Sequence, residues 1–235
     1  MKKSIFMLII PLLSVTAVSC DKDKDEPVNE PVTNTINGHE YVDLGLPSGL
    51  KWATCNVGAS TPKDYGDYFA WGETSPKSEY TESNSLTHGK SLTELTEAGI
   101  INSERILTPS HDAASVNWGG TWRMPTKEEW EELSQNCEWR CTSNITTVGD
   151  NITVIIGTPG YEITGPSGNT IFLPAVGWYG TSHQLLDGVS GRYYSSSVDE
   201  DEENDGGYFI LFDDWLRYVG KGTCYHGFSI RPVSE

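Results

Sequence analysis

The chain is poor in basic residues and has no basic cluster. Its 235 residues include 16 Lys and Arg against 33 Asp and Glu, which gives a formal net charge of -17 at neutral pH. Binding to nucleic acid depends on clustered Lys and Arg that release counterions from the phosphates. An excess of carboxylates also disfavours adhesion of the protein body to anionic lipid. The composition therefore argues against nucleic acid as a partner.

The motifs of common catalytic and metal sites are also missing. No Gly-x-Ser-x-Gly nucleophile elbow and no phosphate-binding glycine loop occurs. Cys137 and Cys141 have no histidine nearby, whereas thiolate sites for zinc or copper need several converging ligands. The five histidines lack metal-binding spacing: His39, His88, His111, His183 and His226. The sequence predicts no catalytic residue, no metal site and no cofactor.

No apolar run is long enough to cross a membrane. The longest one, residues 5–18, covers about 14 residues, whereas a spanning helix needs about 20. It follows two lysines and ends in small residues, which is the order of a secretory signal peptide. We therefore expect residues 1–19 to be a cleaved signal peptide. Its removal takes away two lysines and no acid, so the net charge becomes -19.

Cys20 stands directly after this segment. The preceding Ala17, Val18 and Ser19 resemble the lipobox at which bacterial lipoprotein precursors are cleaved and acylated on cysteine. Several acyl chains anchor a protein stably, whereas a single chain binds a membrane only marginally. The other interpretation is ordinary secretion with Cys20 in a disulfide. Residues 24–26 resemble the signal that sends lipoproteins of gut commensals to the outer face of the outer membrane. We expect a lipidated Cys20 in the outer membrane, with the protein facing the cell exterior.

The remaining chain divides into a tether and one domain. Residues 20–35 are rich in charge and proline and lack a hydrophobic period, which predicts a flexible acidic tether behind the lipid anchor. Residues 36–235 are enough for a single domain with a sizeable core. Eight Trp, 11 Tyr and 24 Gly favour many short strands and turns. The expected strands lie within residues 40–46, 50–58, 151–157, 161–178, 207–212 and 226–233.

Two helices and one tight turn are also predicted. Thr126 and Glu129 form the pattern of a capping box, so a helix should begin there and run toward residue 137. We interpret its glutamates as a solvated face rather than as catalytic acids. The long polar excursion from residue 75 to 109 should contain a short helix within residues 91–99. Residues 165–169 predict a hairpin turn.

The stretch around this helix carries a family resemblance. "NWGGTWRMPTKEEWEEL", residues 117–133, resembles a motif of the formylglycine-generating-enzyme superfamily, a branch of the C-type lectin-like fold. The chain more closely resembles the FISUMP-type domains of bacterial surface lipoproteins. The matching stretches are residues 41–59, 64–74, 168–177, 193–197 and 227–233. The resemblance implies an α+β, C-type lectin-like fold with a mixed twisted sheet, few helices and much irregular loop.

The chain departs from the family pattern in several places. Tyr194 replaces a common tryptophan, Cys141 stands where another tryptophan is common, and residues 145–157 are inserted. The enzymes of the superfamily need a pair of closely spaced cysteines near the C-terminus, where this chain has only Cys224. The resemblance therefore implies a protein without enzyme activity.

The resemblance also implies a pairing of cysteines. An exported protein can form disulfides. Cys55 and Cys137 occupy family-like positions, so we expect a Cys55–Cys137 disulfide. Whether Cys141 and Cys224 form a second pair is left open by the sequence. The alternative is that these cysteines are buried free thiols.

Two stretches compete as a binding site. Residues 199–207 hold six carboxylates in "DEDEENDGG", and such ligands suit calcium. They lack the spacing of a known calcium loop, so we favour a solvated hairpin tip. In C-type lectin-like proteins the C-terminal part displays side chains for recognition. The resemblance thereby implies a ligand-binding surface made by Trp215, Arg217, Tyr218, Tyr225 and His226.

These observations predict an outer-membrane surface lipoprotein with a non-catalytic domain for adhesion or recognition of a glycan or protein ligand. A structural or assembly component of the cell envelope is the alternative, and a divergent enzyme is the third hypothesis. A binding protein should expose aromatic side chains near the C-terminus, whereas a structural role should bury them. An enzyme should have a closed pocket with convergent titratable groups.

Overall fold

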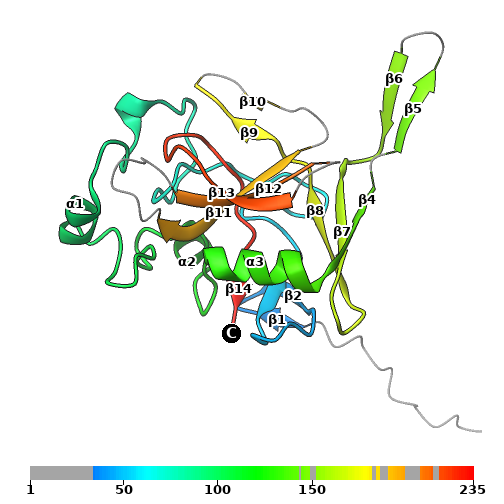
Figure 1. The fold of residues 1–235 in the computed structure, drawn as a ribbon, viewed down its shortest axis with the longest axis horizontal. Coiled ribbons are helices and arrows are strands. Elements are labelled where there is room, and N and C mark those ends of the chain that lie inside the picture. Colours follow the sequence, from blue (N-terminus) through cyan, green and yellow to red (C-terminus); the bar gives the residue numbers. More distant parts are fainter. Residues whose placement is uncertain are drawn as a thin grey trace, which may run out of the picture. The chain divides into compact units, whose positions relative to one another are not determined.

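The computed structural model describes residues 34–142, 144–148, 152–181, 184–185, 190–198, 207–213 and 217–235, which belong to one compact unit (Figure 1). Cys20, the expected signal peptide and the tether up to residue 33 lie outside the described residues. No helix in the described part of the chain is both long and apolar enough to cross a membrane.

The α+β class predicted from the sequence is confirmed. The helices are η1 (Glu82–Asn84, a 3-10 turn), α1 (Leu92–Glu97), α2 (Ala113–Trp118) and α3 (Lys127–Asn136). The first strands are β1 (Thr35–Ile36), β2 (His39–Asp43), β3 (Lys51–Ala53), β4 (Glu138–Cys141), β5 (Asn144–Val148), β6 (Ile152–Ile156) and β7 (Gly160–Thr164). The later strands are β8 (Thr170–Pro174), β9 (Trp178–Tyr179), β10 (Gln184–Leu185), β11 (Gly191–Val198), β12 (Gly207–Phe212), β13 (Arg217–Lys221) and β14 (Val233–Ser234).

The described strands are divided among several small sheets. Their orders are β1-β2-β3-β14, β4-β7-β8, β11-β12-β13, β9-β10 and β5-β6. The strand pairs within the described residues are antiparallel, and parallel bridges join Gly177 to Gly191 and Tyr193 to Ser229. In the first sheet Val233 lies opposite Trp52, so the end of the domain closes onto its beginning. The predicted strands near both ends are therefore neighbours.

Helix α3 begins as the capping pattern predicts. The Thr126 side chain accepts a hydrogen bond from the Glu129 backbone N–H, and the Glu129 carboxylate accepts one from the Thr126 N–H at 2.8 Å. Arg123 binds both oxygens of Glu129, at 2.8 and 2.7 Å. On the inner face Trp130 and Leu133 are fully buried, and the Trp130 indole donates to the Tyr194 carbonyl of β11. The residues around the start of α3 thus hold this helix against the sheet of β11, β12 and β13 (Figure 1).

Arg231 is fully buried and holds the C-terminal strand to the rest of the core. Its guanidinium donates to the Asn56 side chain at 2.8 Å and to the carbonyls of Ala53, Thr54 and Phe172 at 3.0 Å. Burial lowers the pKa of the guanidinium. Four acceptors from two separate segments, residues 53–56 and Phe172, converge on one side chain, so Arg231 organises the core.

The inserted stretch forms a hairpin of its own. β5 and β6 pair with each other from Asn144↔Ile156 to Val148↔Ile152, and in the described part of the chain neither strand joins another sheet. In Figure 1 this hairpin extends away from the other sheets. The predicted turn at residues 165–169 is confirmed, since it connects β7 to β8 with a bond from Gly165 N–H to the Asn169 carbonyl.

The disulfide expected between Cys55 and Cys137 is not formed, and both residues are free thiols. The reason is that they contact different parts of the core. Cys55 packs beside the cluster that contains Trp71 and Phe228, whereas Cys137 packs beside the cluster that contains Trp130. Burial, with a smaller contribution from the Glu132 charge, raises the pKa of Cys137 to about 11.

Candidate functional site

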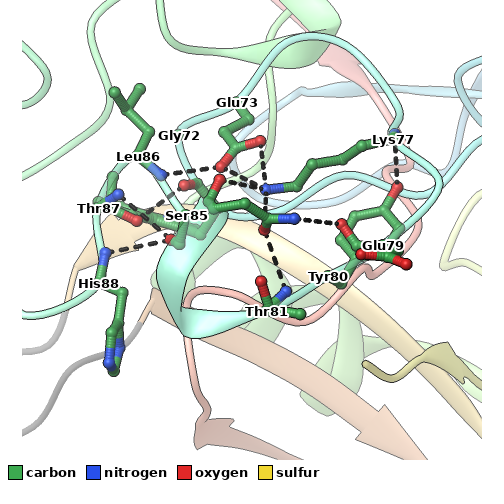
Figure 2. Close-up of polar contacts among 12 residues, drawn as sticks. Gly72, Glu73, Lys77, Glu79, Tyr80, Thr81, Ser85, Leu86, Thr87 and His88 are labelled. Atoms are coloured by element: carbon green, nitrogen blue, oxygen red, sulfur yellow. Dashed lines mark hydrogen bonds and ion pairs between the residues drawn. The ribbon is translucent and has the colours of Figure 1, made fainter. Parts of the chain in front are cut away.

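Residues 72–88, called the η1 loop below, include the end of the stretch 64–74 and the first part of the polar excursion. Lys77 reaches across it, and its ammonium lies 2.9 Å from both carboxylate oxygens of Glu73 (Figure 2). The same ammonium donates to the backbone and side-chain oxygens of Asn84, at 2.9 and 3.0 Å. One Glu73 oxygen also accepts the Leu86 N–H at 2.9 Å. One half-buried ion pair therefore fixes both ends of the loop.

The η1 turn is closed by local polar contacts. The Asn84 side-chain oxygen accepts from the Thr81 N–H at 3.1 Å, while its amide donates to the Glu79 carbonyl at 3.0 Å (Figure 2). Tyr80 anchors the loop from below, because its hydroxyl donates to the Tyr68 carbonyl and accepts the Lys77 N–H. Burial is the main cause that raises the pKa of Tyr80 to about 12. These contacts hold the loop in place although it has little regular secondary structure.

A depression of about 580 Å³ opens on one side of η1. Its lining comes from three stretches of chain: residues 72–75, residues 83–86 and residues 110–111. Hydroxyl, amide and backbone groups dominate this lining, and Leu86 adds an apolar side chain that is 40% exposed. The imidazole of His111 is held by the Gly72 carbonyl, 3.2 Å from Nδ1. The depression is therefore polar and open to solvent.

A second depression, of about 310 Å³, also borders η1. It is lined by Thr81, Glu82, Ser83, Thr181 and Tyr225. Ser83 also lines the first depression, so the two share one edge. Tyr225 is the residue that connects this site with the surface predicted from the sequence.

Tyr225 is held by two imidazoles. Its ring makes edge contacts with His88, at 5.3 Å between centroids, and with His226, at 4.5 Å. His88 in turn lies 3.7 Å from the Glu82 carboxylate. The Tyr225 ring and the Glu82 carboxylate therefore line the same depression, and neighbouring imidazole rings contact both.

His226, which contacts the Tyr225 ring, is half-buried. Its Nδ1 lies 2.6 Å from the Thr223 hydroxyl, and its ring packs 4.4 Å from Trp178. Burial first, and the charge of Arg192 second, lower the pKa of His226 to about 4. The buried Tyr194 hydroxyl lies 2.8 and 3.0 Å from the carbonyls of Thr223 and His226. Residue 226 thus positions the loop that carries Tyr225.

The other predicted binding residues are placed elsewhere. Tyr218 and Arg217 lie on β13, where Tyr218 is 42% exposed and the Arg217 guanidinium stands 5.1 Å above the Trp139 ring. Neither residue lines a depression beside η1. Trp215 and the acidic run 199–206 lie outside the described residues. Of the predicted binding residues that the structure describes, Tyr225 lines a depression beside η1 and Arg217, Tyr218 and His226 do not.

The polar residues of the η1 loop were not predicted. Lys77 and Asn84 lie in the polar excursion from residue 75 to 109, which has no hydrophobic period, and Glu73 lies just before it, at the end of the stretch 64–74. The one usable signal is the i,i+4 spacing of Glu73 and Lys77, which here joins two loop residues. Within the described residues no three His, Cys, Asp or Glu side chains converge as a metal site.

The chain was compared with known proteins by sequence and by structure. No protein-family model, no curated protein and no solved structure matches it.

Proposed function

We propose that this chain is an outer-membrane surface lipoprotein whose C-type lectin-like, FISUMP-type domain binds a glycan without transforming it. The observation that carries the proposal is the position of Tyr225. This residue, implicated by the family resemblance, lines an open depression together with the hydroxyls of Thr81, Ser83 and Thr181. The depression combines an aromatic side chain with several hydrogen-bonding groups.

This combination suits a sugar better than the other ligands considered. A sugar ring offers many hydroxyls, and Thr and Ser hydroxyls can both donate to and accept from them. Its C–H face is apolar and packs on an aromatic side chain. Because Tyr225 is already fixed by His88 and His226, little side-chain entropy is lost on binding.

The same geometry favours binding over the alternatives. A structural role would bury the aromatic residues in an apolar interface, whereas Tyr225 borders a polar and open depression. An enzyme would bring titratable groups together in an enclosed site. In the first depression the Glu73 carboxylate is instead paired with Lys77 and accepts the Leu86 N–H. Lipidation of Cys20 supplies the expected anchor, through several acyl chains.

The test compares two tyrosines of the predicted surface. The purified full chain, Tyr225→Ala and Tyr218→Ala are applied to an array of neutral, amino, sulfated and sialylated oligosaccharides. We expect Tyr225→Ala to lose at least about tenfold in affinity, or about 1.4 kcal/mol, and Tyr218→Ala to bind like the parent. The reverse pattern would move the site to β13, and no binding by the parent chain would refute glycan recognition.

The anchor is tested separately. Cells that express the parent chain or Cys20→Ser are labelled with a fatty acid and fractionated. We expect label and membrane association for the parent chain only. An unlabelled parent chain would contradict the lipoprotein assignment, whatever the outcome of the array.

A further inference from the structure

The two depressions beside η1 have similar chemistry. Each has one apolar side chain at its wall, Leu86 in the first and Tyr225 in the second. Each also presents hydroxyls, with Ser75, Ser85 and Ser110 in the first and Thr81 and Thr181 in the second. A surface that repeats one kind of contact suits a ligand made of repeated units.

The edge between the depressions is exposed and is held by polar contacts. Ser83 lines both of them, and all three residues of η1 are exposed. The Ser83 hydroxyl is held 3.2 Å from that of Thr81, and Lys77 donates to the neighbouring Asn84. A chain can therefore cross η1 without displacing a buried side chain.

The lining also indicates the charge of the ligand. Neither depression has a Lys or Arg among its lining residues, whereas Glu73 and Glu82 each line one of them. Sulfated and carboxylated sugars are recognised by Arg and Lys through charge-assisted hydrogen bonds. With a net charge of -17 for the whole chain, an anionic ligand would also be repelled at long range.

We infer that the two depressions are subsites of one groove, and that the groove binds a neutral, linear oligosaccharide longer than two units across η1. This inference rests on the proposed glycan-binding function and gives its ligand a length and a charge. Short ligands occupy the Tyr225 subsite alone, and longer ligands gain the contacts at Leu86.

Chain length gives the first test. Cello-, malto-, manno- and xylo-oligosaccharides of two to six units are titrated against the full chain by calorimetry, with a chondroitin sulfate hexasaccharide for comparison. For one neutral series we expect the affinity to rise at least about tenfold from two to six units, with no tighter binding of the sulfated probe. Equal affinity at all lengths, or a preference for the sulfated probe, would overturn the inference and leave glycan binding intact.

Substitutions at the shared edge and at Leu86 give the second test. Ser83→Trp should reduce hexasaccharide binding at least about tenfold, while Ser103→Trp, at an exposed serine in another turn, should have no effect. Leu86→Ser should weaken the hexasaccharide several-fold and leave the disaccharide unchanged. Its control is Val116→Ser, at an exposed apolar residue of α2. Unchanged hexasaccharide binding in Ser83→Trp and Leu86→Ser would overturn the single groove. Absence of binding to every oligosaccharide would refute the proposed function as well.

Discussion

Two regions of the molecule use polar side chains in opposite ways. The motif core, defined here as Arg123, Glu129, Trp130, Tyr194 and Arg231, carries the resemblance to known domains and lies mostly within the protein. The η1 loop lines both depressions, and only its first residues, 72–74, fall within a stretch that carries the resemblance. The most recognisable residues of the chain thus maintain its scaffold, and most residues with open hydrogen-bonding surface lie outside those stretches.

The difference has a physical cause. Arg231 and Trp130 join segments that are distant in the sequence, and their partners are mostly backbone groups. A buried polar group that loses its partner costs about 1–3 kcal/mol, so such residues are strictly required by the fold. Lys77 and Glu73 join two ends of one loop near the surface, where solvent can replace a lost contact. Substitutions should therefore affect global stability in the first region and local order in the second.

The largest effect is expected at Arg231. Arg231→Met leaves the Asn56 side chain and the carbonyls of Ala53, Thr54 and Phe172 without their donor in the core. Four such losses predict a fall of at least about 4 kcal/mol in the free energy of unfolding, or failure to fold. Urea unfolding followed by tryptophan fluorescence measures it.

The matched control for Arg231 is a surface arginine. Arg140 is paired with Glu162, and its side chain is mostly exposed. Arg140→Met should lower the free energy of unfolding by less than about 1 kcal/mol. Similar losses for the two variants would contradict the assignment of Arg231 as the centre of the core.

The next effect concerns Tyr194, the residue of the motif core that contacts the loop carrying Tyr225. Tyr194→Phe removes the hydroxyl beside the carbonyls of Thr223 and His226, and should cost about 1–3 kcal/mol. Amide hydrogen exchange should become faster in residues 223–228. Tyr193→Phe removes an equally buried hydroxyl that donates to the Pro174 carbonyl, so it should cost a similar amount without affecting residues 223–228. If both variants loosen that stretch equally, Tyr194 does not specifically support the wall that carries Tyr225.

The sequence predicts those parts of this fold whose determinants are local. The start of α3 follows from Thr126 and Glu129, whose contact spans three residues. The turn between β7 and β8 follows from Gly165 to Asn169 for the same reason, and α1 falls within the expected residues 91–99. In each case the side chain and its backbone partner are close in the sequence.

The candidate site could not be predicted as fully, because its determinants are not local. Strand alternation cannot show that Tyr218 lies on the outermost described strand of its sheet while Tyr225 lies in the following loop. The contacts of Lys77 with Asn84 form only because the chain folds back on itself. No hydrophobic period in this part of the sequence predicts that reversal. The expected Cys55–Cys137 bond came from the family resemblance alone, and the two thiols contact different clusters.

A smaller effect depends on pH. The folded pKa of His226 is about 4, below its ordinary value of 6.5, so the unfolded chain binds a proton between these values and the folded protein does not. The free energy of unfolding should therefore fall as the pH decreases from about 6.5 to 4. The full shift corresponds to about 3 kcal/mol, and we expect about 1–2 kcal/mol because the ring is half-exposed.

The pH effect is isolated by comparing the parent chain with His226→Gln. Urea unfolding at several pH values between 7 and 4 gives the difference in free energy of unfolding between the two proteins. The contributions of carboxylates such as Asp112 cancel in that difference. Burial raises the pKa of Asp112, so its own contribution has the opposite sign and is common to both proteins. Parallel curves for the two proteins would show that His226 titrates normally in the folded state.

The smallest global effect is expected in the η1 loop. Lys77→Met removes the ammonium that joins Glu73 to Asn84, but solvent and the Leu86 N–H still reach the Glu73 carboxylate. We expect the free energy of unfolding to fall by about 1 kcal/mol or less, since the loop can open without the core. Exchange of the Thr81 and Leu86 amides should rise at least about tenfold, because both amides donate within the network that Lys77 closes. The control is Lys51→Met, which removes an ion pair with Asp43 in the first sheet and should leave those two amides unchanged. If Lys77→Met instead lowered global stability as much as Tyr194→Phe, the loop would belong to the cooperative core, and the contrast between the two regions would fail.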